Sequence, residues 1–274
     1  MLSLIFGIII RIVTNSYLNV FQKLLTQKGE SSSIINFYSY LGLTIIGIIF
    51  CPAPVYSQEI LINICIMGLL GALGNYFIIK ALSSGELSII APINSYKPVV
   101  ALLGGILLLN EIPNIAELFA LALIILGTVF LYNNKSAFNK AILYRFLALF
   151  FSGTEAVFIK KILLVSNIES AFLYWAFSGF IFATIFALCA KKSPKISKSN
   201  IKYQAVLILM IALMQYSTNY VFSRMNVAYA LALFQLSTLI SVFLGASLFN
   251  EKDLKKKICA TIIMLIGACI LVLS

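Results

Sequence analysis

The chain of 274 residues contains no histidine, and only 11% of its residues are charged. Soluble domains carry about 25% charged residues, so this chain has too few to cover a surface exposed to water. Histidine is the commonest general base and proton relay and a common metal ligand. The five cysteines form no Cys-x-x-Cys pair, which favours small buried hydrophobic residues over metal ligands. We therefore expect no metal, no cofactor and no enzymatic activity.

The composition instead matches a bilayer, because 61% of the residues are hydrophobic and the mean hydropathy is +1.03. An apolar run of about 20 residues is long enough to cross a membrane as a helix. The sequence predicts an all-α polytopic membrane protein with no soluble domain. Its ten predicted transmembrane helices are 2–25, 34–51, 59–82, 86–109, 114–132, 141–164, 168–190, 202–223, 226–249 and 256–273.

An internal repeat divides the predicted helices into two sets of five. Shifted by 140 residues, the segment 105–111 aligns with 245–251, and both segments end in Asn-Glu. The predicted repeats are residues 1–136 and 137–274. An odd number of helices in each repeat makes the second copy enter the membrane from the opposite face, which gives an inverted repeat around a central cavity.

The basic residues predict an orientation. The chain has 20 Lys and Arg against 9 Asp and Glu. Fifteen of the bases lie in or beside the odd-numbered loops and three beside the even-numbered loops. Cytoplasmic loops of membrane proteins carry an excess of Lys and Arg, so we expect the odd-numbered loops in the cytoplasm and both termini outside. The basic excess is then a topology signal, and we expect the lipid bilayer as a partner and no nucleic acid.

Charged residues inside a membrane are costly and commonly face a wet cavity or each other. Arg11, Asn15 and Asn19 are spaced by four residues and share one helix face. This stripe predicts a cavity lining, and hydrogen bonds between helices are the alternative. Lys97 and Glu155 are the other charges near the middle of their predicted helices.

Two prolines flank Asn94, Tyr96 and Lys97 in the helix 86–109. Proline removes backbone donors, and broken helices are where transporters place their substrates. Lys97 would meet a substrate carboxylate or phosphate, or exchange a proton, or else form a structural ion pair with Glu155. Glu155 would carry a coupling proton, hold a substrate amine, or serve as a counter-ion only.

Further polar and aromatic residues complete the predicted substrate site, although aromatic residues near helix ends also serve as interfacial anchors. These candidates are Tyr38, Tyr40, Asn75, Tyr76, Ser152, Tyr174, Trp175, Gln215, Tyr216, Asn219 and Gln235.

Two five-helix repeats, each with a fourth helix ending in Gly-x-x-x-x-Asn-Glu, resemble the EamA-type branch of the drug/metabolite transporter superfamily. The similarity covers the whole chain and is most specific at residues 81–113 and 223–251. Asn110 and Asn250 replace the glycine that usually precedes the glutamate. The resemblance implies a basket of eight helices around a central cavity, with 114–132 and 256–273 outside it. It also implies transport of amino acids, other metabolites or drugs. Many members are described with cytoplasmic termini, opposite to the orientation that the charges predict.

We therefore expect a secondary transporter that moves a small organic metabolite across the plasma (inner) membrane by alternating access, coupled to protons or working by exchange. The opposite signs of Lys97 and Glu155 suit an amino acid or a similar zwitterion. A cationic or amphipathic metabolite or drug, or an organic anion held by Arg11 and Lys97, is the alternative. A membrane enzyme would need clustered acids or histidines, and a channel would need a repeated filter. The sequence shows neither pattern. We expect a monomer or a homodimer.

Overall fold

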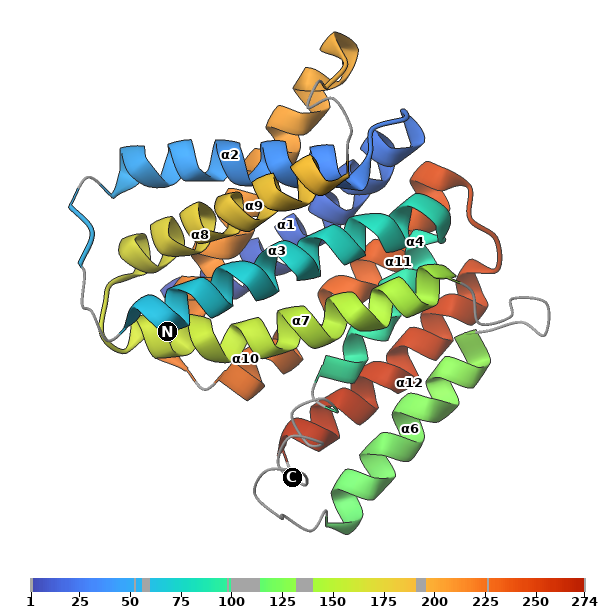
Figure 1. The fold of residues 1–274 in the computed structure, drawn as a ribbon. Helices are drawn as coiled ribbons and strands as arrows, with labels where there is room; N and C mark the ends of the chain where they lie inside the picture. The colour runs from blue at the N-terminus through green and yellow to red at the C-terminus, as the bar shows by residue number, and fades with distance from the viewer. Residues whose placement is uncertain are drawn as a thin grey trace.

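The computed structural model describes residues 2–51, 53–55, 60–97, 99, 114–131, 140–190, 196–225 and 227–273. Within these ranges every regular element is a helix (Figure 1). Seven helical stretches in this part, the last of them Ala230–Phe249, are long and apolar enough to cross a membrane, so the chain is a multi-pass membrane protein. The elements are α1 (Leu2–Gln27), α2 (Ser32–Phe50), α3 (Leu61–Ser84), α4 (Leu87–Ile90), η2 (Pro92–Tyr96), α6 (Ile115–Leu131), α7 (Lys140–Leu163), α8 (Ile168–Cys189), η3 (Lys198–Asn200), α9 (Ile201–Arg224), α10 (Val227–Phe234), α11 (Ser237–Phe249) and α12 (Leu254–Leu273).

Eight of the ten predicted helices form as single helices whose ends lie within two residues of the prediction. Local capping explains two of the helix ends. The side chain of Asn167 accepts a hydrogen bond from the Ser170 amide at the start of α8. Asn250 ends α11 in the left-handed conformation, with φ of 53°. After glycine, asparagine is the residue that adopts this conformation most easily, which explains how it replaces the glycine of the motif.

The other two predicted helices are broken. In the segment predicted as 86–109, the described residues 86–97 form α4 and then the 3₁₀ helix η2, which begins at Pro92. The segment predicted as 226–249 forms α10 and α11, separated at residues 235 and 236. The two prolines predicted the first break, whereas no feature of the sequence predicted the second. The first Asn-Glu motif and the predicted boundary between residues 136 and 137 lie outside the described residues.

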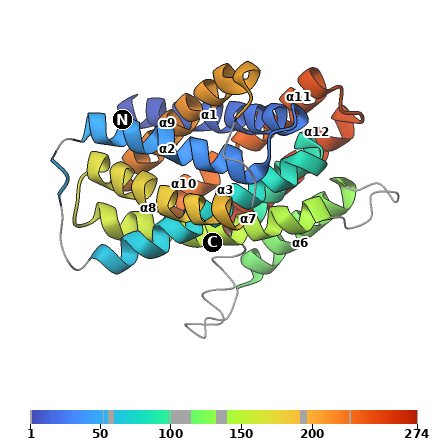
Figure 2. The ribbon, with the colours of Figure 1, turned by 45° about the horizontal axis from the view of Figure 1, so that its top comes forward.

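The helices pack in pairs that join the two halves of the chain (Figures 1 and 2). The most extensive pairs are α3 with α7, α6 with α12, α1 with α9, and α2 with α8. Helices α6 and α12 lie side by side at one edge of the bundle in Figure 1. These pairs are symmetric between the two halves of the chain. If each helix is exchanged for the one at the same place in the other half (α1 for α7, α2 for α8, α3 for α9 and α6 for α12), the same four pairs result.

The distribution of polarity is that of a protein in lipid. Large apolar side chains such as Phe6, Phe119 and Val129 face outward and are more than half exposed. The interior buries polar groups, including the fully enclosed side chains of Gln22 and Asn36. Lipid cannot satisfy hydrogen-bonding groups, so they are buried in the protein where they find partners. The outward apolar surface therefore corresponds to the hydrocarbon region.

Helices α6 and α12 approach each other at two glycines. A β-carbon on Gly127 would lie 2.8 Å from the Ala260 carbonyl oxygen, and one on Gly267 would lie 2.7 Å from the Ala120 carbonyl oxygen. These are backbone atoms and cannot rotate away. Small residues at such positions are typical of helix contacts in membranes.

Replacing Gly127 by valine should push α6 away from α12 and lower the free energy of unfolding by about 1–3 kcal/mol, the usual cost of overpacking. Thermal unfolding in detergent measures the effect. Gly153→Ala is the matched control, because a β-carbon on Gly153 meets no atom within 4 Å. A Gly127→Val variant that unfolds at the wild-type temperature would contradict the close approach.

Candidate functional site

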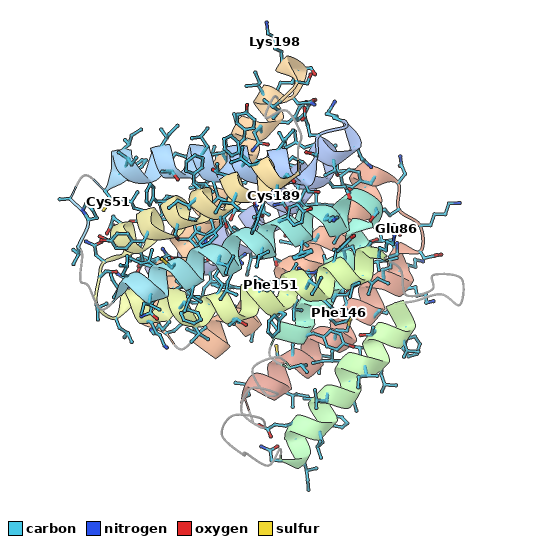
Figure 3. The ribbon with its side chains drawn as sticks, viewed as in Figure 1. Cys51, Glu86, Phe146, Phe151, Cys189 and Lys198 are labelled. Carbon is cyan, nitrogen blue, oxygen red and sulfur yellow. The ribbon has the colours of Figure 1, made fainter. Side chains whose placement is uncertain are left out.

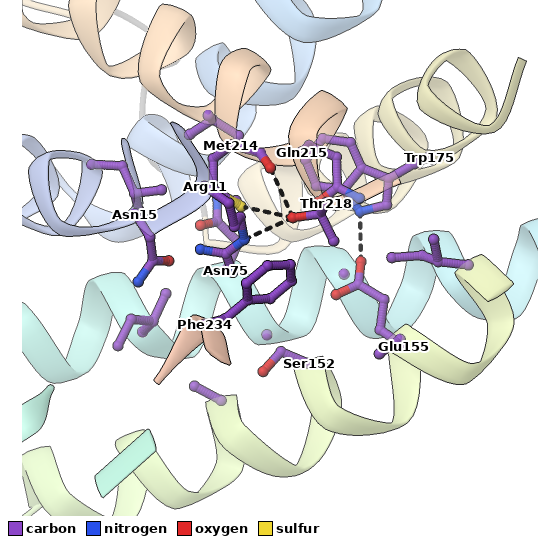
Figure 4. A pocket seen from close by; sticks show the side chains of 18 of the residues that line it. Arg11, Asn15, Asn75, Ser152, Glu155, Trp175, Met214, Gln215, Thr218 and Phe234 are labelled. Atoms are coloured by element: carbon purple, nitrogen blue, oxygen red, sulfur yellow. Dashed lines mark hydrogen bonds between the residues drawn. The ribbon is translucent and has the colours of Figure 1, made fainter. Parts of the chain in front are cut away.

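A cavity of about 150 Å³ lies inside the bundle (Figure 4). Its lining comes from α1, α2, α3, η2, α7, α8, α9 and α10, together with Lys97, which follows η2 directly. Within the described ranges, neither α6 nor α12 contributes to the lining. This separation of lining from non-lining helices agrees with the expectation that helices 114–132 and 256–273 stand outside the basket.

Three bases line the cavity, and two of them have unused donors. The Nε atom of Arg11 donates to Thr218 Oγ1 over 2.7 Å, and its guanidinium lies 4.7 Å from the centre of the Phe234 ring. The Nη1 atom of Arg11 is buried and has no hydrogen-bond partner among the described residues. The ammonium of Lys97 also has none in that part of the chain. Lys97 interacts electrostatically with Arg11, Arg145 and Glu155.

Glu155 is the acid in this lining. Its carboxylate accepts a hydrogen bond of 2.5 Å from Trp175 Nε1, as Figure 4 shows. Gly71 makes room for the carboxylate, since a β-carbon there would collide with it. The Tyr40 ring packs 5.2 Å from the Trp175 ring, and its buried hydroxyl has no partner in the described residues. No ion pair between Lys97 and Glu155 forms within 4.0 Å among those residues.

Arg145 is the third base, and the sequence predicted it as one of the bases in or beside the odd-numbered loops. The structure places it near the start of α7 but not at the surface, because Arg145 is only 7% exposed and lines the cavity. Its Nη2 atom donates to Asn94 Oδ1 over 2.6 Å. The signal was present in the sequence, since Ser152 and Glu155 follow Arg145 by seven and ten residues and so share its helix face.

The polar stripe of α1 continues beyond the predicted residues. Asn15 donates to Ser237 Oγ over 2.9 Å, and Asn19 lines the cavity. Lys23 follows Asn19 by four residues and forms a buried ion pair of 2.6 Å with Glu251. The stripe therefore leads from the cavity to one end of the bundle.

Several charged and polar groups meet at that end of the bundle and form a cluster that we call the Glu251 cluster. The carboxylate of Glu251 also accepts hydrogen bonds from the Leu87 amide (2.7 Å), the Ser88 amide (2.8 Å) and the Ser88 hydroxyl. Glu86, labelled in Figure 3, pairs with Lys257 beside it. Lys23 and Lys257 were counted from the sequence among the bases in or beside the odd-numbered loops, and the structure buries both of them. The cluster is Lys23, Glu86, Ser88, Glu251 and Lys257.

Eleven of the predicted site residues line the cavity, and they come from seven separate elements or their ends. They are Arg11, Asn15, Asn19, Tyr40, Asn75, Asn94, Lys97, Ser152, Glu155, Trp175 and Gln215.

The other seven predicted residues do not line it, and most are tyrosines whose hydroxyls bind elsewhere. Tyr96 bonds to Thr128 on α6, Tyr174 to the Val55 carbonyl and Tyr216 to Glu169. Tyr76 accepts a hydrogen bond from Lys80. The remaining three, which are Tyr38, Asn219 and Gln235, are also outside the lining. The prediction of these tyrosines as site residues followed polarity alone, and polarity did not specify which side of the helix faces inward.

Besides Arg145, sequence reasoning missed Thr218, Phe234 and Met214 in the lining. Thr218 and Met214 lie on the same face of α9 as the predicted Gln215, so helical spacing offered a signal for both. Phe234 lies at the end of α10, directly before the unpredicted break, and no sequence signal distinguished it from the other phenylalanines.

Comparisons with known proteins agree with this geometry. The model of the EamA-like transporter family matches residues 2–133 and again residues 139–273. An uncharacterised protein of Methanocaldococcus jannaschii is 28% identical over 102 residues, which cover 34% of this chain and 74% of that protein. A solved crystal structure superposes with a TM-score of 0.68 over 98% of this chain and 96% of the other, at 15% identity. The last similarity concerns the fold alone.

The family match covers nearly all of the chain, and the described helices surround a cavity that is lined by charged groups. The chain therefore belongs to the EamA-like transporter family of the drug/metabolite transporter superfamily and is a membrane transporter.

Proposed function

We propose that this transporter moves a small organic metabolite with a carboxylate group across the plasma membrane by alternating access through the cavity. An amino acid or a similar zwitterion is the leading substrate class. The observation that carries the proposal is that, among the described residues, the Lys97 ammonium and Arg11 Nη1 have no hydrogen-bond partner and line the same cavity as the Glu155 carboxylate. A proton gradient or solute exchange would supply the energy, and the protein would act as a monomer or a homodimer.

The arrangement of charges suits both ends of a zwitterion. Lys97 and the free Nη1 atom of Arg11 would bind the substrate carboxylate, because hydrogen bonds between charged groups are stronger than neutral ones. Glu155 would bind the ammonium group, or carry a coupling proton when no substrate is bound. In either case a charged substrate replaces water in an interior that otherwise disfavours isolated charge.

An organic anion is the second candidate, since the described residues of the lining include three bases and one acid. A substrate with two negative charges would offset this excess better than a zwitterion does. A cationic substrate would have to approach Arg11, Lys97 and Arg145 together, and like charges in a medium of low dielectric repel strongly. The geometry therefore favours the first two classes over a cationic metabolite or drug.

We further propose that the fold consists of two inverted five-helix repeats, residues 1–136 and 137–274. Equivalent contacts recur in both halves. Gly127 faces Ala260 as Ala120 faces Gly267, and the two contacts exchange on a shift of 140 residues. The family model also matches the chain twice in succession. The relative from Methanocaldococcus jannaschii is about half as long as this chain, which is the length of one such repeat.

A similar contact occurs between the first and third helices of each proposed repeat. Lys23 Nζ donates to the carbonyl of Gly85, which directly follows α3, over 3.1 Å, and Lys160 Nζ donates to the carbonyl of Phe222, near the end of α9, over 2.5 Å. The two carbonyls are not strictly equivalent, because the shift of 140 residues that aligns α3 with α9 places Gly85 on Met225. In both halves a lysine of the first helix binds the backbone near the end of the third, which is consistent with two repeats.

The orientation remains the one that the charges predict, with the odd-numbered loops in the cytoplasm and both termini outside. Setting aside the buried Lys23, Arg145 and Lys257 leaves twelve bases on that side against three on the other, so the bias persists. A reporter fused to the C-terminus tests this proposal. A cytoplasmic reporter signal would contradict it.

Counterflow in proteoliposomes tests the transport proposal. Vesicles containing the purified protein are loaded with one unlabelled solute, and uptake of the same labelled solute is followed. The series compares neutral amino acids, dicarboxylates, organic phosphates and a quaternary amine. Saturable counterflow of a neutral amino acid supports the zwitterion proposal, and counterflow of the anions alone favours the second candidate. Flux that neither saturates nor shows counterflow would contradict a carrier.

A further inference from the structure

The two helix breaks are joined by a chain of buried hydrogen bonds. Arg145 Nη2 donates to Asn94 Oδ1 over 2.6 Å, and Asn94 Nδ2 donates to Gln235 Oε1 over 2.7 Å. Gln235 is fully buried and Arg145 is 7% exposed. Three side chains from η2, α7 and the junction of α10 and α11 therefore form one continuous connection (Arg145–Asn94–Gln235).

At the first break this chain satisfies a carbonyl that the backbone leaves free. The Asn94 amide donates to the Ala91 carbonyl (3.0 Å), whereas a continuous α-helix would direct it to Ile90. Arg145 Nε instead donates to the Ile90 carbonyl over 3.0 Å. A carbonyl without a partner is costly at membrane depth, so Arg145 stabilises the break itself.

The second break repeats this solution. The Gln235 amide donates to the Ala232 carbonyl over 3.0 Å, and the Leu231 carbonyl is released from its usual helical partner. Gln235 Nε2 donates to the Leu231 carbonyl over 2.9 Å. Arg145 and Gln235, the two ends of this series of hydrogen bonds, thus each bind a carbonyl that one of the breaks released.

We propose that Arg145, Asn94 and Gln235 are positioning residues that couple the two breaks, so that both shift together when the cavity changes the side to which it is open. This inference rests on the proposed alternating access. If one break moved without the other, the Asn94–Gln235 hydrogen bond would separate inside the membrane, and Asn94 Nδ2 and Gln235 Oε1 would lose their partner. Lys97 follows η2, and its amide donates to the Asn94 carbonyl, so the same chain also holds Lys97 at the cavity.

An accessibility experiment tests the coupling without a known substrate. The five native cysteines are replaced by alanine, and Ser152→Cys places a thiol in the cavity lining. A membrane-impermeant methanethiosulfonate reagent is applied to right-side-out and to inside-out vesicles, and the two labelling rates are measured. The variants are Asn94→Leu, Gln235→Met, their double variant, Arg145→Met and the conservative Arg145→Lys. Gln204→Met is the matched control, because it removes a buried interhelical amide that bonds to Ser39, outside the cavity.

In the cysteine-free protein that carries only Ser152→Cys, we expect labelling from both sides of the membrane. Asn94→Leu, Gln235→Met and Arg145→Met should each slow labelling from one side about threefold to tenfold relative to the other side. The double variant should be no slower than the slower single variant, because both remove the same hydrogen bond. Arg145→Lys should restore part of the rate, and Gln204→Met should retain the original ratio of the two rates.

Two results would overturn the coupling. One is an unchanged ratio of the two rates in all three variants. The other is an equal decrease in the labelling rate from both sides, in variants whose unfolding temperature is lower to a matching extent, because general destabilisation then explains the decrease. A starting protein that is labelled from one side only would instead contradict alternating access, so failure of the coupling and failure of the proposed function give different results.

Discussion

Replacing Lys97 by alanine should abolish or greatly weaken saturable transport of a substrate that carries a carboxylate. The Lys97 ammonium reaches the cavity without a hydrogen-bond partner among the described residues, so its donors are available to a substrate. Losing a hydrogen bond to a charged group costs about 1.5–3 kcal/mol, which corresponds to an increase in KM of about tenfold to more than a hundredfold. Counterflow measured over a range of substrate concentrations determines the change.

Glu155→Gln distinguishes the substrate classes in the same assay. It should weaken transport of an amino acid and leave a dicarboxylate unchanged or improved, because the glutamine no longer repels a second negative charge. Lys80→Ala is the control. It removes a lysine that lies over the rings of Tyr76 and Tyr144, away from the cavity lining. Wild-type transport in both Lys97→Ala and Glu155→Gln would refute the proposed charge recognition. Recovery of transport in the double variant would identify a structural ion pair.

Replacing Lys23 by alanine should destabilise the protein strongly. Lys23 and Glu251 bury more than nine-tenths of their side chains. Removing one partner of a buried pair costs about 3–5 kcal/mol, because the other charge stays buried and unpaired. Thermal unfolding in detergent should show a large decrease in Tm. Lys252→Ala, an exposed lysine of the neighbouring loop, should leave Tm nearly unchanged.

A double variant separates the ion pair from simple packing. Lys23→Met with Glu251→Gln removes both charges and retains most of the volume, so it should recover much of the stability that Lys23→Ala loses. If the double variant unfolds at a temperature as low as that of Lys23→Ala, the loss arises from packing and the ion-pair explanation is wrong.

The same cluster predicts a dependence of stability on pH. Burial raises the pKa of Glu251, but hydrogen bonds from Lys23 and Ser88 outweigh that effect and hold the pKa below its ordinary value of 4.5. A lowered pKa stabilises the folded state above the ordinary value, and this contribution is lost as the pH falls through the folded-state value. Acidification below about pH 4.5 should therefore lower Tm more in the wild type than in Glu251→Gln. If Tm falls with pH equally in the wild type and in Glu251→Gln, this explanation is wrong.

The sequence identified the helices well because hydropathy is a local property. A run of about 20 apolar residues has the length of a membrane-spanning helix, and a helix satisfies all of its backbone groups within the segment. The breaks were harder to predict. Pro92 signalled the first, because a proline has no amide hydrogen. Gln235 gave no such signal at the second, where the side chain satisfies the Leu231 carbonyl that the break releases.

The site was only partly predictable for a related reason. The charges Arg11, Lys97 and Glu155 stood out because charge inside a membrane is rare, and all three line the cavity. Arg145 lies near the start of α7 and resembled a loop charge in the sequence, although the fold buries it. Tyr96 was grouped with Lys97, but the 3₁₀ geometry of η2 directs its hydroxyl to Thr128 on α6.

By itself, the sequence determined that this protein crosses a membrane as helices, that its two halves resemble each other and that a few charges remain inside. These features follow from composition and from spacing along one helix. Only the tertiary structure decided which polar residues converge on the cavity and that Lys23 meets Glu251 across the bundle. It also showed that Asn94 and Gln235 join the two breaks. Such contacts join residues 141 or more positions apart, and they depend on how the helices rotate and pack, which local periodicity does not specify.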